Sequence, residues 1–168
     1  MEHVMRRDPA LIPLSQQHHD ALALCVYIER AEKSGHLDLA HWNREVTAAW
    51  QSEIRWHFQS EEEIVFPAAN RIASLQPLIS ELVLAHVELR QLFHTAEKND
   101  LTAPDLLRLR QLLNDHVRQE ERQLFEQMQT TIPAADMAAM GARLNAFFEQ
   151  HTGGPACALR HPQPQSHT

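Results

Sequence analysis

The stretch WHFQSEEEIVFP, residues 56–67, places His57 four residues before Glu61 within a segment that is otherwise typical of a core-facing helix. Residues at this spacing lie on one helix face, about 5–6 Å apart at their Cβ atoms. An isolated pair of this kind is either a solvated surface pair or two ligands of one metal ion. The stretch HVRQEERQLF, residues 116–125, repeats H-x-x-x-E-E with His116 and Glu120, and both copies place a Phe nine residues after the His. The repetition favours metal binding.

The composition limits the class of protein. The chain has 168 residues, a formal net charge of −7 and twelve histidines. Histidine is a common metal ligand, so this content also favours a metal site. An acidic chain lacks the basic face that nucleic acids require, which predicts no nucleic-acid partner. No apolar run of about 20 residues is present, so we expect no membrane segment, and the absence of a signal peptide predicts a cytoplasmic protein.

Helix-breaking residues divide the chain into five predicted helices, and no segment alternates as a strand does. We expect Ser15 to cap the first helix and Gly35 to end it. The remaining predicted boundaries are Asp38 to Pro67, Ser74 to residues 97–100, Thr102 to Thr130, and Pro133 to about residue 150. We therefore predict one metal-binding helical domain over residues 1–150 and a disordered tail, rich in Pro and His, over residues 151–168.

The apolar stripes of the first four helices are interrupted at six positions. Short connections make neighbouring helices antiparallel, so the predicted fold is all-α, an up-down-up-down four-helix bundle with a short additional C-terminal helix. With a rise of about 1.5 Å per residue, four helices bring these positions close to one layer. Burying a carboxylate there requires a partner or a metal ion. The predicted metal ligands are His18, His57, Glu61, His86, His116 and Glu120.

At these residues the chain resembles the hemerythrin-like family of HHE cation-binding bundles. That family has one His on the first and third helices and H-x-x-x-E on the second and fourth, which six residues between 11 and 130 match in order. The resemblance implies a non-haem di-iron centre in which the two glutamates bridge the irons and the histidines cap them. Imidazole with carboxylate suits iron, although zinc or manganese remains an alternative.

Two positions depart from the oxygen-carrying members of that family. Those proteins place a second His four residues after the third-helix His, where this chain has Arg90, and an Asp five residues after the fourth-helix His, where this chain has Glu120 at four. The predicted coordination is therefore poorer in histidine and more open. His19 is an alternative fifth imidazole or a residue of the helix flank, and we expect His94 near the site but not as a ligand.

Three further glutamates, Glu62, Glu63 and Glu121, follow the predicted ligands directly. We expect them to be solvated, with one of them holding a ligand histidine. Cys25 is expected to be a small buried hydrophobe, with a thiol near the metal as the alternative. The chain has only one other cysteine, Cys157, and no CxxC motif, so no disulfide framework is expected.

The leading functional hypothesis is a di-iron protein that binds O2, NO or peroxide for sensing, scavenging or storage. The alternative is iron handling or the repair of damaged iron–sulfur clusters. No catalytic residue is assigned, because no general acid–base pair stands apart from the ligands, although a weak oxidase or peroxidase activity stays open. A metal-free interaction bundle would leave a costly pair of buried glutamates. Monomer and homodimer are both open.

Overall fold

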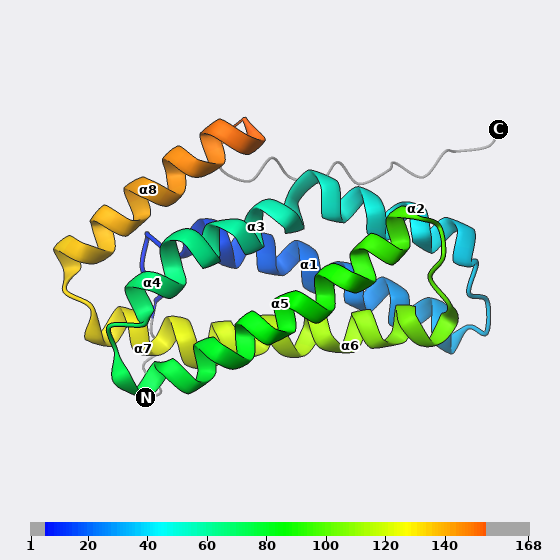
Figure 1. Ribbon diagram of the computed structural model, residues 1–168, viewed down its shortest axis with the longest axis horizontal. Coiled ribbons are helices and arrows are strands. Elements are labelled where there is room, and N and C mark those ends of the chain that lie inside the picture. The colour runs from blue at the N-terminus through cyan, green and yellow to red at the C-terminus, as the bar shows by residue number, and fades with distance from the viewer. Residues whose placement is uncertain (1–5, 154–168) are drawn as a thin grey trace.

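The computed structural model describes residues 6–153, which form four long helical runs with a fifth helix against their side (Figure 1). The first run is α1 (Ile12–Lys33) and the third is α5 (Gln76–Glu97), preceded by the short 3-10 turn η3 (Ala73–Leu75). The fourth run comprises α6 (Ala103–Gln119), the π-helical turn η4 (Glu120–Leu124) and α7 (Phe125–Thr131). The fifth helix is α8 (Ala134–Thr152). The predicted all-α bundle is confirmed.

The second run is interrupted twice by π-helical turns. It comprises α2 (Leu39–Ala49), η1 (Trp50–Ile54), α3 (Arg55–Ser60), η2 (Glu61–Val65) and α4 (Phe66–Ala69). Pro67 was expected to end this helix, and that prediction is wrong, because the helix continues to Ala69. In the wider turn the Phe66 N–H bonds to the Glu61 carbonyl, five residues earlier. The proline then lies in the first turn of α4, a position that tolerates its missing N–H.

Local capping accounts for several of the other helix boundaries. Gly35 follows α1 with a φ of 74°, a conformation that favours glycine, and the Asp38 side chain accepts a bond from the His41 N–H. Thr102 caps α6 as predicted, in a capping box with Asp105. Ser15 does not cap α1, which begins at Ile12 with a proline in its first turn. Ser74 lies in η3 and does not cap α5.

Two apolar cores lie on either side of a layer of buried histidines and glutamates. Along α1, Leu14 belongs to one core and Cys25 to the other, with the buried His18 between them. The same order recurs on α5, where His86 separates Leu82 from Leu89. The predicted stripes therefore face the interior, and packing on both sides holds the polar layer in place. Within residues 6–153, no helix combines the length and apolar character needed to cross a membrane.

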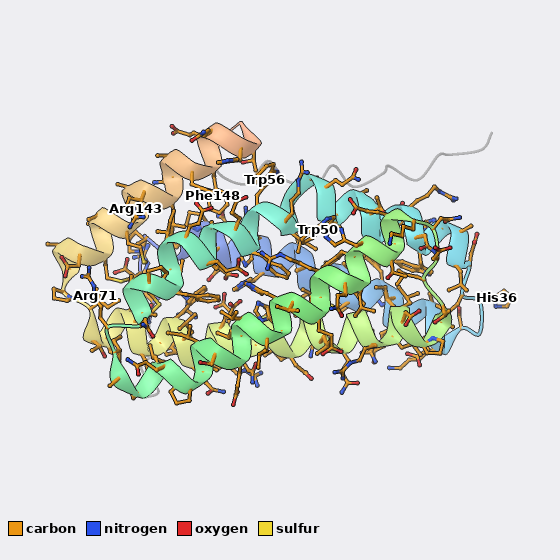
Figure 2. All side chains as sticks on the ribbon, in the orientation of Figure 1. His36, Trp50, Trp56, Arg71, Arg143 and Phe148 are labelled. Atoms are coloured by element: carbon orange, nitrogen blue, oxygen red, sulfur yellow. The ribbon has the colours of Figure 1, made fainter. Side chains whose placement is uncertain are left out.

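Helix α8 covers the second run on one side of the bundle (Figure 1). The fully buried Phe148 belongs to the first apolar core, and Trp56 of α3 packs against that core. Figure 2 shows both side chains between α8 and α3. The Trp56 ring also lies 4.6 Å from the His151 ring, centroid to centroid. Trp42 and Trp50 are buried in the second core. The helix continues to Thr152, so the first two residues of the predicted disordered tail are helical, and residues 154–168 lie outside the described residues.

Replacing Phe148 by Ala should lower the free energy of unfolding by about 3–5 kcal/mol, because it leaves a cavity where α8 meets the bundle. Glu149→Ala on the exposed side of the same helix should change it by less than about 0.5 kcal/mol. Urea denaturation followed by circular dichroism measures both. Equal effects of the two substitutions would contradict the docking of α8.

Candidate metal centre

The six predicted ligands come together in one buried layer of the bundle. Helices α1, α3, α5 and α6 contribute one histidine each, and the turns η2 and η4 each begin with a glutamate. None of the six residues exposes more than 5% of its surface. A π-helical turn inserts one extra residue and is frequent at functional sites. The members of this layer are His18, His57, Glu61, His86, His116 and Glu120.

The layer divides into two groups of ligand atoms that share both glutamates. The first group adds His18 and His57 to the shared pair, and the second adds His86 and His116. Within each group the ligand atoms lie within 4.8 Å of one another. The two Nε2 atoms are 3.0 Å apart in the first group and also 3.0 Å apart in the second. Two nitrogens bonded to one ion at about 2.1 Å and at right angles would be separated by about 3 Å.

Each glutamate directs one oxygen to each histidine pair. Glu61 Oε1 is 3.0 Å from His57 Nε2, whereas its Oε2 is 3.3 Å from His86 Nε2. The orientation is repeated in the second carboxylate.

Glu120 Oε2 is 3.1 Å from His18 Nε2, and Oε1 of the same side chain is 3.3 Å from His116 Nε2. Both carboxylates therefore span the space between the two histidine pairs, the arrangement that bridging ligands of two metal ions require.

The chemistry of the donor atoms also fits a pair of cations. All four oxygens of Glu61 and Glu120 are buried, and none has a hydrogen-bond partner among residues 6–153. Buried carboxylate oxygens without partners are costly, because nothing replaces their hydration. Metal ions between the nitrogen pairs would satisfy these oxygens and the imidazole lone pairs together. The site is therefore suited to metal binding.

A carboxylate outside the layer orients His18. The His18 Nδ1 lies 2.7 Å from Glu121 Oε1. The same oxygen also accepts a 2.6 Å hydrogen bond from the Ser15 hydroxyl. Arg7 forms a 2.7 Å salt bridge with the other Glu121 oxygen. An Nδ1–H that donates to this carboxylate leaves the Nε2 lone pair directed at the site. Ser15 thus supports a ligand histidine instead of capping the helix.

Glu62 holds His86 in the same way, with 2.7 Å between its Oε1 and the His86 Nδ1. Arg90 forms two hydrogen bonds to this carboxylate, at 2.7 and 3.0 Å. The expectation that only one of the following glutamates would hold a ligand histidine is therefore wrong, since both Glu62 and Glu121 do so. Arg90, where an oxygen carrier would have another ligand, instead fixes Glu62.

The other two histidines differ from each other. His57 Nδ1 lies 2.8 Å from Gln17 Oε1, a contact that the sequence did not predict. His116 Nδ1 is buried, and no described residue forms a hydrogen bond with it. Three of the imidazoles thus have a polar atom that fixes the ring and its tautomer, whereas His116 depends on packing alone. The two groups that could hold a metal ion are consequently unequal.

Aromatic rings pack on the imidazoles from the apolar cores. Phe58 stacks on His86 with ring centroids 3.9 Å apart. The two phenylalanines of the repeated motif have matching roles, since Phe66 lies 5.5 Å from His86 and Phe125 lies 5.4 Å from His18. The shared Phe of the motif therefore contacts a histidine from another helix and limits its movement.

Residues weighed as additional ligands lie outside both groups. His19 is exposed, and so is His94, whose Nδ1 lies 2.7 Å from Glu97 Oε2. The Cys25 thiol is buried in the second core and donates to the Arg110 carbonyl at 3.4 Å. Burial raises the pKa of this thiol to about 12. Cys25 is the small buried hydrophobe that the sequence predicted.

The pKa values of Glu62, outside the layer, and Glu120, within it, are shifted in opposite directions. Burial raises the pKa of Glu62, but hydrogen bonds from His86 and Arg90 outweigh it and lower the pKa to about 2. Burial and the negative charge of Glu61 raise the pKa of Glu120 to about 8. Two carboxylates that share a buried site rarely ionise together without cations.

The family comparison agrees with this geometry. The chain matches the hemerythrin HHE cation-binding domain over residues 13–128, and it therefore belongs to this family. Neither the curated proteins nor the solved structures with which it was compared gave a match. The matched region includes every residue of the buried layer, while α8 lies beyond it.

Replacing Glu62 by Ala should weaken metal binding about 10–100-fold, because His86 would lose the group that orients its ring. Glu63→Ala is the matched control, since this neighbouring glutamate is exposed and, among the residues that the structure describes, accepts a hydrogen bond only from Gln59. Competition with a chromophoric chelator measures both affinities. An equal loss in the two variants would show that Glu62 does not support the site.

Metal uptake at pH 7 should release about three protons, because ligands must lose their protons to bind a cation. In the metal-free protein burial lowers the pKa of His86, but the neighbouring carboxylates of Glu61 and Glu62 raise it to about 9. The pKa of His18 is also raised, since three neighbouring carboxylates outweigh burial, and Glu120 retains a proton. Calorimetry of ferrous iron binding in buffers of different ionisation enthalpy counts the protons. Uptake without proton release would contradict these charge states.

Proposed function

We propose that the protein is a non-haem di-iron protein that binds O2, NO or peroxide at open positions of its metal centre. In this proposal Glu61 and Glu120 bridge the two ions, while His18 with His57 and His86 with His116 hold one ion each. The two ligand groups that share both carboxylates are the observation that supports the proposal most strongly. A cytoplasmic location and a monomeric or homodimeric state belong to the same proposal.

The ligand count explains why a small molecule would bind. Each group offers two nitrogens and, with one oxygen from each bridging glutamate, two oxygens. Iron in a mixed imidazole and carboxylate site accepts more than four ligands, so positions remain for an exogenous ligand. Zinc and manganese accept the same donors, and affinity alone does not select iron. The iron would supply the reversible redox or ligand-binding chemistry.

The surroundings favour binding a small molecule over turning over a large one. The layer is enclosed between two apolar cores, and its ligand side chains are almost fully buried. Such an enclosed site admits a diatomic molecule or peroxide but excludes a bulky substrate. We therefore assign a role in sensing, scavenging or storage.

The iron-loaded, reduced protein should change its absorption spectrum within a stopped-flow mixing experiment with O2 and with NO. His86→Ala should abolish this change and reduce the bound iron below two ions per chain, because the second group loses a nitrogen ligand. His94→Ala is the matched control, since this exposed histidine lies on the same helix and outside both groups. Metal analysis accompanies the kinetics. An absence of spectral change with both gases in the iron-loaded protein would refute the proposed function.

A further inference from the structure

A small cavity lies beside the first histidine pair. Its volume is about 10 Å³, which is room for a single water-sized molecule. The imidazoles of His18, His57 and His116 line it, and apolar side chains form most of the remaining wall. Apart from these histidines, the polar side chains in the wall are Gln17 and Glu53. The cavity is therefore where a small molecule would meet the metal centre and a protein carboxyl at once.

The π-helical turn η1 carries Glu53 near its end. The three π-helical turns among residues 6–153 each contain a carboxylate with a buried oxygen, since η2 and η4 begin with Glu61 and Glu120. Glu53 precedes His57 by four residues, so both side chains lie on the same face of the second run. The fourth run has an apolar residue, Leu112, at the corresponding distance before its histidine, so only the second run brings a carboxyl to this place.

Glu53 is incompletely paired. Its Oε1 is buried without a hydrogen-bond partner in the described part of the chain, although the residue as a whole keeps partial exposure to solvent. Gln17, the other polar group of the wall, already accepts a bond from His57 through its Oε1. No salt bridge among the described residues involves Glu53, and the charged group that acts on it is Asp20 of α1. A carboxyl with one oxygen inside and contact with solvent is well placed to exchange a proton.

We propose that Glu53 is a ligand-recognition residue of this site, whose protonated carboxyl donates a hydrogen bond to the end of a small anion or peroxide that reaches from the metal centre into the cavity. The inference rests on the proposed function, since it assumes that such a molecule binds at the metal centre. When an anion enters, one proton from solvent joins the Glu53 carboxylate and the new O–H points to the anion. The net charge of the cavity is conserved and no electron is transferred.

The electrostatics of the metal-free protein agree with this role. Burial, followed by the negative charge of Asp20, raises the pKa of Glu53 to about 7. An incoming anion would raise the same pKa further, because it penalises the negative carboxylate. Hydrogen bonds that involve an ionised partner are about twice as strong as neutral ones. Glu53 would therefore favour anions over neutral diatomic molecules of the same size.

Azide is a suitable probe, since it is a small anion with a charge-transfer absorption on ferric iron. The oxidised, iron-loaded protein should bind azide about tenfold more weakly for each unit of pH above neutrality, because binding is linked to one proton. Glu53→Gln should bind azide with an affinity that varies less than about twofold between pH 7 and pH 9. Glu45→Gln, an exposed glutamate of the same run, should retain the dependence of the wild type.

The possible results separate the two proposals. An unchanged pH dependence in Glu53→Gln would overturn the role of Glu53 while leaving the proposed function intact. An absence of azide, O2 and NO binding in the iron-loaded wild type would overturn the proposed function and this inference together. A weak pH dependence in the wild type itself would also refute the link to a proton.

A measurement on the metal-free protein gives independent support. A carboxyl whose pKa is raised by folding stabilises the protein below its unfolded pKa, and this contribution is lost as the pH rises through the folded value. Glu53→Gln, which carries no charge, should therefore melt above the wild type at pH 8 and close to it at pH 5. The same melting difference at both pH values would show that Glu53 is not protonated near neutrality and would overturn the inference.

Discussion

Two buried carboxylates whose oxygens form no hydrogen bond with any described residue are the constraint on which the structure depends. Glu61 and Glu120 are fully buried, and each places one oxygen toward either histidine pair. Removing two such charges from water costs several kcal/mol per ion unless cations offset it. The bundle directs four imidazoles to the same layer, where together with the carboxylates they could hold such cations. The family membership, the ligand geometry and the proposed function all follow from that one arrangement.

The rest of the fold holds this layer rigidly and makes its two halves unequal. Apolar cores above and below prevent the helices from sliding, and aromatic rings pack on the imidazoles. Outside the layer, two arginine-supported glutamates orient one histidine of each pair. Gln17 orients His57, while His116 has no polar partner. The cavity with Glu53 lies on the side of His57, so the polar support of the imidazoles and the proposed ligand contact are both greatest at the first histidine pair.

The sequence predicted the bundle and the six clustered residues because both depend on helical periodicity. A histidine or glutamate on an apolar stripe must face the interior, even where the backbone bends slightly. The predicted helix end at Pro67 was wrong, because nothing in the sequence pattern indicated the π-helical turn η2. This wider turn lets the helix continue past Pro67. The sequence also did not predict that Gln17 contacts His57 or that Glu53 lines the cavity. Nor did it predict that Glu62 and Glu121 would each hold a histidine, because all these contacts form between helices. For Glu53 a signal existed, because its spacing extends the motif to E-x-x-x-H-x-x-x-E.

The most direct test of the account is anomalous diffraction from crystals of the metal-loaded protein, recorded at the absorption edge of the bound metal. The account predicts two peaks per chain, about 3.5–4 Å apart, one beside each histidine pair and both in contact with the two glutamates. A single peak, or peaks away from Glu61 and Glu120, would contradict the bridged pair on which every other conclusion depends.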